Sequence, residues 1–251
     1  MTLRAVAFVL IAIAPTAAVL HAQTNTFDIV SGGKVVGHST YTLAKAKQGF
    51  RLQGRTTYVI RPAEARTTDD VRLTDNYGFV QSSITDQNSQ IVYSYIPDKS
   101  RTTLTIGTIQ AGAMDSHSLP IKPDVAFLPS FDAGAAQVML LLALTHPTST
   151  NLYNVIVPGN SGHSQKQSDA KSLDAEAGDS HPGDNDYDVL WAKGADATGT
   201  LDGKPITLHS FTLTGKVNWT FYADDQNNLM QVDSSQDKAS CVRANFKLGG
   251  S

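Results

Sequence analysis

Hydrophobic and polar residues alternate along most of the chain, in short segments that turn residues separate. Alternation places every second side chain on the same face of an extended strand, and it is clear from Val35 to Leu43 and from Leu52 to Ile60. Turn residues recur roughly every 8–12 residues, a spacing typical of antiparallel hairpins. The pattern therefore predicts a mainly β fold, built as a strongly curved antiparallel sheet that forms an open or half barrel.

One segment departs from this alternation and predicts a helix. Asp132 is a suitable N-cap, Ala133 to Leu144 is continuously helix-compatible, and His146-Pro147 ends the helix. The segment is apolar on every face, and a helix of that kind has to be buried on most sides. We therefore expect one buried apolar helix that lies inside or across the curved sheet.

The first 22 residues have the pattern of a cleaved signal peptide. Arg4 is followed by an apolar run from Ala5 to Ala14, and small residues precede a cut after Ala22. The run is too short for a membrane span, which needs about 20 apolar residues, and no cysteine near the cut could carry a lipid. We expect export to a bacterial periplasm or medium, with no segment that spans the membrane and with residues 23–251 as a single β-rich domain.

Residues 159–187 interrupt the alternating pattern with a polar, acidic stretch. Such a segment cannot bury enough apolar area to offset the entropy of ordering it, so we expect a disordered insertion within the domain. Its charged side chains are Lys166, Asp169, Lys171, Asp174, Glu176, Asp179, Asp184 and Asp186.

Composition and charge narrow the classes of function. With 251 residues, 41% of them hydrophobic and 17% charged, the chain fits one globular domain. Lys and Arg number 20 against 23 Asp and Glu, which excludes the basic surface that nucleic-acid binding requires. The single cysteine, Cys241, cannot form an internal disulfide, and we expect it to be buried as a small apolar side chain.

Candidate catalytic and metal-binding residues are few. Gly178-Asp179-Ser180 matches a motif of one esterase class, but no apolar strand precedes it to form the turn that such a serine needs. His38 and His209 lie on two similar strands and could share a metal ion if both faced the interior. Asp184, Asp186 and Asp188 alternate as calcium ligands would, without the glycine and glutamate that complete a calcium loop. The sequence favours a protein without enzymatic activity, cofactor or metal.

Several short motifs resemble a group of bacterial proteins. These motifs are Phe27-Asp28-Ile29 followed by Gly33 to Gly37, Leu128 to Phe131 before the apolar helix, and the Gly203-Lys204 hairpin followed by Val217 to Thr220. Together they resemble the DUF3108-like exported proteins, over most of residues 26–248 and with the acidic insertion as a departure. The resemblance implies an open β-barrel of the lipoprotein-carrier type, with helices over the concave side, and supplies no catalytic residue.

The function that these observations favour is binding without chemistry. We expect an exported protein of the cell envelope that holds a lipid or another apolar or amphipathic ligand in its half-barrel, with Val138, Met139 and Leu141 of the helix as contacts. Two alternatives stay open: a secreted hydrolase that uses Ser180 or a metal at His38 and His209, and a structural protein whose sheet edges pair with a partner. The identity of the ligand, the choice between a cavity and a filled core, and the oligomeric state stay open too.

Overall fold

The computed structural model describes residues 24–60, 63–122, 125–129, 131–157 and 185–249. Within them the chain forms one helix and seventeen strands of one sheet. The first nine strands are β1 (Thr24–Ser31), β2 (Lys34–Lys45), β3 (Phe50–Ile60), β4 (Ala63–Leu73), β5 (Phe79–Asp86), β6 (Ile91–Pro97), β7 (Thr103–Gln110), β8 (Ala113–Pro120) and β9 (Val125–Phe127). After the helix α1 (Ala133–Thr145) come β10 (Leu152–Val157), β11 (Asn185–Lys193), β12 (Ala197–Leu201), β13 (Lys204–Gly215), β14 (Trp219–Ala223), β15 (Leu229–Ser234), β16 (Ala239–Arg243) and β17 (Phe246–Leu248).

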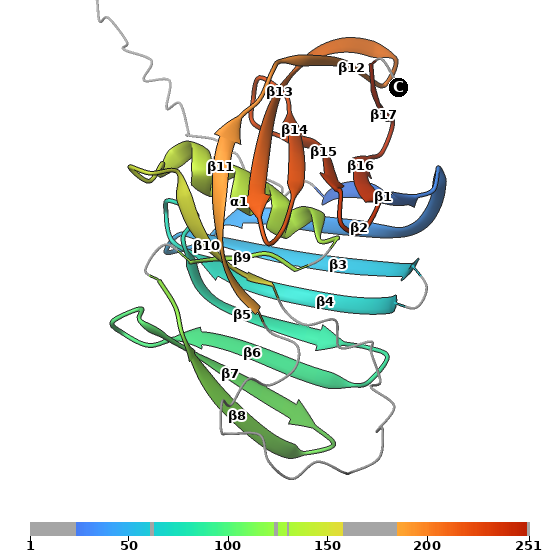
Figure 1. Ribbon diagram of the computed structural model, residues 1–251. Coiled ribbons are helices and arrows are strands. Elements are labelled where there is room, and N and C mark those ends of the chain that lie inside the picture. Colours follow the sequence, from blue (N-terminus) through green and yellow to red (C-terminus); the bar gives the residue numbers. More distant parts are fainter. Residues whose placement is uncertain (1–23, 61–62, 123–124, 130, 158–184, 250–251) are drawn as a thin grey trace, which may run out of the picture.

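The sheet has two halves that the pairing of β1 with β16 joins (Figure 1). Strands β1 to β8 form an antiparallel meander in which each strand pairs with the next along the chain. In the other half, β16, β15, β14, β13, β11, β10 and β9 follow one another, and β12 pairs with β13 and β17. The predicted mainly β, antiparallel-rich class is therefore confirmed, and the sheet is not closed.

The structure differs from the sequence prediction mainly at polar strands. β8 lacks the alternation of hydrophobic and polar residues that predicts a strand, and in β4 the larger apolar residues, Val71 and Leu73, stand only at its end. Residues of β8 are exposed or half-buried, and Met114 is 77% exposed. A strand that faces solvent on both sides shows no alternation, although its backbone is hydrogen-bonded to its neighbour as in any strand.

The acidic insertion is shorter than predicted at its C-terminal end. β11 begins at Asn185, so residues 185–187 belong to a strand, and Asn185 pairs with Val157 at the end of β10. The backbone of these residues forms its hydrogen bonds with a strand that precedes the insertion. Their residue types alone did not predict this pairing. The rest of the insertion, like the predicted signal peptide, lies outside the described residues.

The helix begins where the sequence predicted, with Asp132 as its N-cap. The Asp132 carboxylate accepts a hydrogen bond from the N–H of Ala135 at 2.8 Å, and the N–H of Ala133 donates to Ser39 Oγ of β2 at 3.1 Å. Gly134 allows α1 to approach the sheet closely, since a Cβ there would lie only 2.9 Å from Cβ of Tyr41. Ten of the thirteen helix residues are buried.

Packing around α1 draws on both halves of the sheet. The helix contacts β2 and β3 of the first half and β9 and β15 of the second. A second, smaller apolar cluster consists of Leu208, Met230 and Phe246. Cys241 is a free, buried thiol, as predicted. Among the described residues, no helix is long and apolar enough to cross a membrane.

Two acidic side chains are buried at the N-terminus of α1. Asp69 of β4 lies over Gly54 of β3, and its buried carboxyl lies within hydrogen-bond reach of the carboxyl of Asp132. Burial, followed by the nearby charge of Asp132, raises the pKa of Asp69 well above its usual value. Burial also raises the pKa of Asp132, although the hydrogen bond from Ala135 acts against this. The fold therefore favours a protonated Asp69 beside the capping carboxyl.

We expect Asp69→Asn to make stability less dependent on pH. A raised pKa in the folded state stabilises the protein fully below the unfolded pKa of about 3.9, and this contribution is lost as the pH rises through the raised value. The amide is neutral at every pH. Between about pH 4.5 and about pH 8, the free energy of unfolding in urea should therefore fall less for Asp69→Asn than for the wild type, by about 1 kcal/mol or more.

Asp70→Asn is the matched control for this measurement. The Asp70 carboxylate accepts a hydrogen bond from Arg51 Nε at 2.8 Å, and that bond lowers the pKa of Asp70. A lowered pKa stabilises the protein above about pH 4, so the control should lose stability near neutral pH, by less than about 1 kcal/mol because the pair is half-exposed. If the free energy of unfolding of Asp69→Asn kept the wild-type dependence on pH, Asp69 would not be the buried group whose protonation stabilises the fold.

Candidate ligand-binding cleft

A cleft of about 550 Å³ lies beside α1 and the turn between β14 and β15. Its volume is within the range of small-molecule sites, about 300–1,000 Å³. The apolar and aromatic residues of its wall are Tyr41, Leu43, Tyr77, Leu141, Leu201 and Met230. Its polar residues are Asn25, Gln137, Asp224, Gln226, Asn227, Asn228 and Arg243. The cleft therefore lies between the main core and the second apolar cluster, and it presents both kinds of surface to a ligand.

Gln137 connects α1 by hydrogen bonds to β2 and to the turn that leads into β15, which lie on two sides of the cleft. Its Oε1 accepts hydrogen bonds from the Tyr41 hydroxyl at 3.1 Å and from the N–H of Leu229 at 2.7 Å, and its Nε2 donates to the Asn227 carbonyl at 2.9 Å. Burial raises the pKa of Tyr41, which keeps this hydroxyl a donor. The sequence analysis missed Gln137, although one amide in an otherwise apolar helix is a signal that could have identified it.

The turn from Asp224 to Asn228 forms the polar rim of the cleft. Asp224 Oδ1 accepts hydrogen bonds from the N–H groups of Gln226 at 2.9 Å and Asn228 at 2.8 Å, and its Oδ2 accepts one from Asn228 Nδ2 at 2.9 Å. Asn227 has a φ of 62°, a left-handed conformation that asparagine tolerates. The Asp224 carboxylate is thus occupied in shaping the turn.

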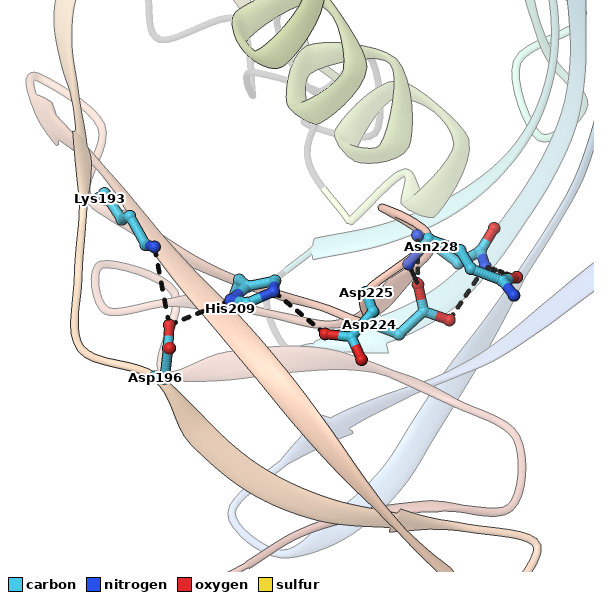
Figure 2. Close-up of polar contacts among 7 residues, drawn as sticks. Lys193, Asp196, His209, Asp224, Asp225 and Asn228 are labelled. Carbon is cyan, nitrogen blue, oxygen red and sulfur yellow. Dashed lines mark hydrogen bonds and ion pairs between the residues drawn. The ribbon is translucent and has the colours of Figure 1, made fainter.

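A histidine holds the same turn from outside the cleft (Figure 2). His209 of β13 places Nδ1 3.0 Å from Asp196 and Nε2 3.1 Å from Asp225, and Lys193 lies 3.9 Å from Asp196. The hydrogen bond with His209 lowers the pKa of Asp196. A neutral imidazole has one N–H, so only the imidazolium can donate to both carboxylates.

The three helix residues predicted to bind a ligand border different spaces. Leu141 is half-buried and lines the cleft. Val138 is buried and lines a separate apolar cavity of about 10 Å³, and Met139 is fully buried in the main core. Met139 lies about 100° around the axis from Val138, whereas Leu141 follows Val138 on the same side of α1, about one turn further along it. Leu141 is thus the one of the three that lines this cleft.

The residues considered for catalysis or metal binding are not brought together. His38 is 61% exposed and contacts Asp28 at 2.9 Å, whereas His209 has its own carboxylate partners. Over the part of the chain that the structure describes, no three His, Cys, Asp or Glu side chains are arranged to hold a metal ion. Asp188 forms an ion pair with Lys122. Ser180, Asp184 and the side chain of Asp186 lie outside that part.

Comparisons with protein-family models, with curated proteins and with solved structures give no match. The resemblance to the DUF3108-like proteins therefore stays a prediction from short motifs. The function has to be argued from the cleft itself.

We expect Gln137→Leu to destabilise the protein. The change leaves the buried N–H of Leu229 and the Asn227 carbonyl without their partner, and each such loss costs about 1–3 kcal/mol. The free energy of unfolding in urea should fall by about 3 kcal/mol. The control, Gln226→Leu on the exposed rim, should change it by less than about 0.5 kcal/mol. Equal stability of Gln137→Leu and the wild type would show that these hydrogen bonds do not hold the helix in place.

We expect His209→Ala to loosen the rim without unfolding the protein. The contacts of His209 are partly exposed and contribute less than about 1 kcal/mol. The amide of Asn227, which donates to the Asp224 carbonyl at 2.9 Å, should exchange with deuterium severalfold faster in the variant. His38→Ala removes a histidine–aspartate contact on another hairpin and should leave this amide unchanged. Unchanged exchange in His209→Ala would mean that the turn needs no outside support.

Proposed function

We propose that this protein is an exported, non-enzymatic protein of the bacterial cell envelope that binds one amphipathic molecule in the cleft beside α1. In this proposal the sheet is a strongly curved half-barrel around a buried α1. The cleft lies beside the part of α1 that the sheet leaves uncovered. The observation that supports it best is the lining, in which Leu43, Leu141 and Met230 share one space with Gln226 and Arg243. Small-molecule sites combine apolar surface with placed polar groups, and the described residues of this lining include seven polar ones beside six apolar or aromatic ones.

The packing of the helix favours an amphipathic ligand over a purely apolar one. The apolar cavity at Val138 and a second one at Phe131 each have a volume of about 10 Å³. That is the room of about one water molecule, so neither can take a lipid chain without repacking. The larger space at Leu141 has a polar rim, and a ligand there needs polar groups of its own to replace the water it displaces.

The lining of the cleft also supports binding without chemistry. Nucleophilic catalysis needs a serine, cysteine or similar group activated by a nearby base. The described residues that line the cleft include no serine, cysteine or histidine, and the one carboxylate among them, that of Asp224, is occupied by three hydrogen bonds within its turn.

The test is native mass spectrometry of the full chain expressed in a bacterium and purified from the periplasm. We expect a mass that corresponds to cleavage after Ala22 and a 1:1 adduct that organic extraction removes. Leu141→Trp should lower the fraction of protein that carries the adduct, because the larger side chain occupies part of the cleft beside α1.

The matched control is Leu190→Trp, since Leu190 is an exposed leucine on β11. This variant should retain the adduct, and thermal melts should show both variants folded. A wild-type protein without any adduct that also binds no added amphiphile would contradict the proposal, as would an adduct that Leu141→Trp leaves at wild-type stoichiometry.

A further inference from the structure

We propose that the ligand of this cleft is an amphiphile with one acyl chain and an anionic headgroup, a carboxylate or a phosphate, that binds Arg243. This inference rests on the proposed function and adds the chemical class of the ligand. It comes from the juxtaposition of a guanidinium without a partner and an aliphatic wall in the same cleft.

Arg243 is the cationic residue among the described residues of the lining, and its charge acts on the Tyr41 hydroxyl of the same cleft. It is the last residue of β16, where its backbone pairs with Phe27 of β1, and it is half-buried. No hydrogen bond or ion pair of its guanidinium is found among the described residues. Arg51, by contrast, forms an ion pair with Asp70, and Arg101 donates to the Phe79 carbonyl.

An unpaired guanidinium in this position favours an anion as its partner. The group has five N–H donors in a planar fork that matches carboxylates and phosphates. Asp224 is the acidic residue of the lining, but its oxygens already accept the hydrogen bonds that shape its turn. The donors of Arg243 are therefore available to a ligand, and partial burial strengthens their attraction for a negative charge.

The rest of the wall determines what else the ligand carries. Leu43 of β2, Leu141 of α1 and Leu201 of β12 are half-buried and offer aliphatic surface from both halves of the sheet, while Met230 of β15 is buried in the wall. This surface suits an alkyl chain, which gains free energy for each methylene group removed from water. A volume of about 550 Å³ limits the ligand to a single chain, since a diacyl phospholipid exceeds it.

The experiment is calorimetric titration of the purified mature protein, after organic extraction and refolding, with ligands of equal chain length below their micellar concentrations. The probes are decanoate, decyl phosphate, decanol, decyltrimethylammonium and, as a headgroup without a chain, inorganic phosphate. We expect 1:1 binding of at least one of the two anionic amphiphiles, and weaker binding of the other probes. Whichever anion binds more tightly then identifies the headgroup.

The variant Arg243→Gln removes the charge, and Arg55→Gln on the exposed outer face of β3 is the matched control. We expect the dissociation constant of the anionic amphiphile to rise by about ten- to a hundredfold in Arg243→Gln, with little change for decanol and none in the control. If Arg243→Gln did not fold, the ranking of charged and uncharged probes on the wild type would still test the proposal.

The outcomes separate this inference from the proposed function. If decanol or decyltrimethylammonium bound as tightly as the anions, or if Arg243→Gln bound them as the wild type does, the anionic headgroup would be wrong and amphiphile binding would stand. Binding of inorganic phosphate as tight as that of decyl phosphate would overturn the role of the chain. If no amphiphile bound to the wild type, both proposals would fail.

Discussion

The need to keep one apolar helix out of water governs this structure. α1 has no polar face, so it can persist only if other elements cover it on most sides. The first half of the sheet provides β2 and β3 for this purpose, the second half provides β9 and β15, and the pairing of β1 with β16 holds the halves together. The cleft lies at Leu141, where this cover is incomplete.

Hydrogen bonds from polar groups fix the position of α1 between the two halves of the sheet. At its N-terminus, Asp132 caps the first turn and Ser39 of the sheet accepts an N–H, while Gln137 binds the turn that leads into β15. Apolar packing has little directional preference, whereas each of these hydrogen bonds specifies one position and orientation. The burial of Asp69 beside Asp132 lowers the stability of this arrangement, because two carboxyl groups next to each other in an apolar interior are costly unless one of them is protonated.

The cleft combines features that the two halves of the molecule supply separately. Its aliphatic wall comes from strands of both halves and from the helix, and its rim is a turn that contacts His209. Among the described residues of its lining, Arg243 at the end of β16 carries the positive charge. A site of this kind can distinguish ligands by charge at one end and by size at the other. Such discrimination suits a protein that holds a molecule without changing it, which is the function we propose.

Sequence patterns alone determined the class of the fold, the position of α1 and its cap, and the burial of Cys241, because all of these follow from local periodicity and residue type. Strands with two solvated faces, such as β8, left no periodicity to detect. The residues of the cleft depended on tertiary structure. A helix that is apolar all round does not reveal which side borders an opening, so Val138 and Met139 could not be separated from Leu141. Likewise, Gln137 and Arg243 are far apart in sequence, and only folding brings both into the cleft.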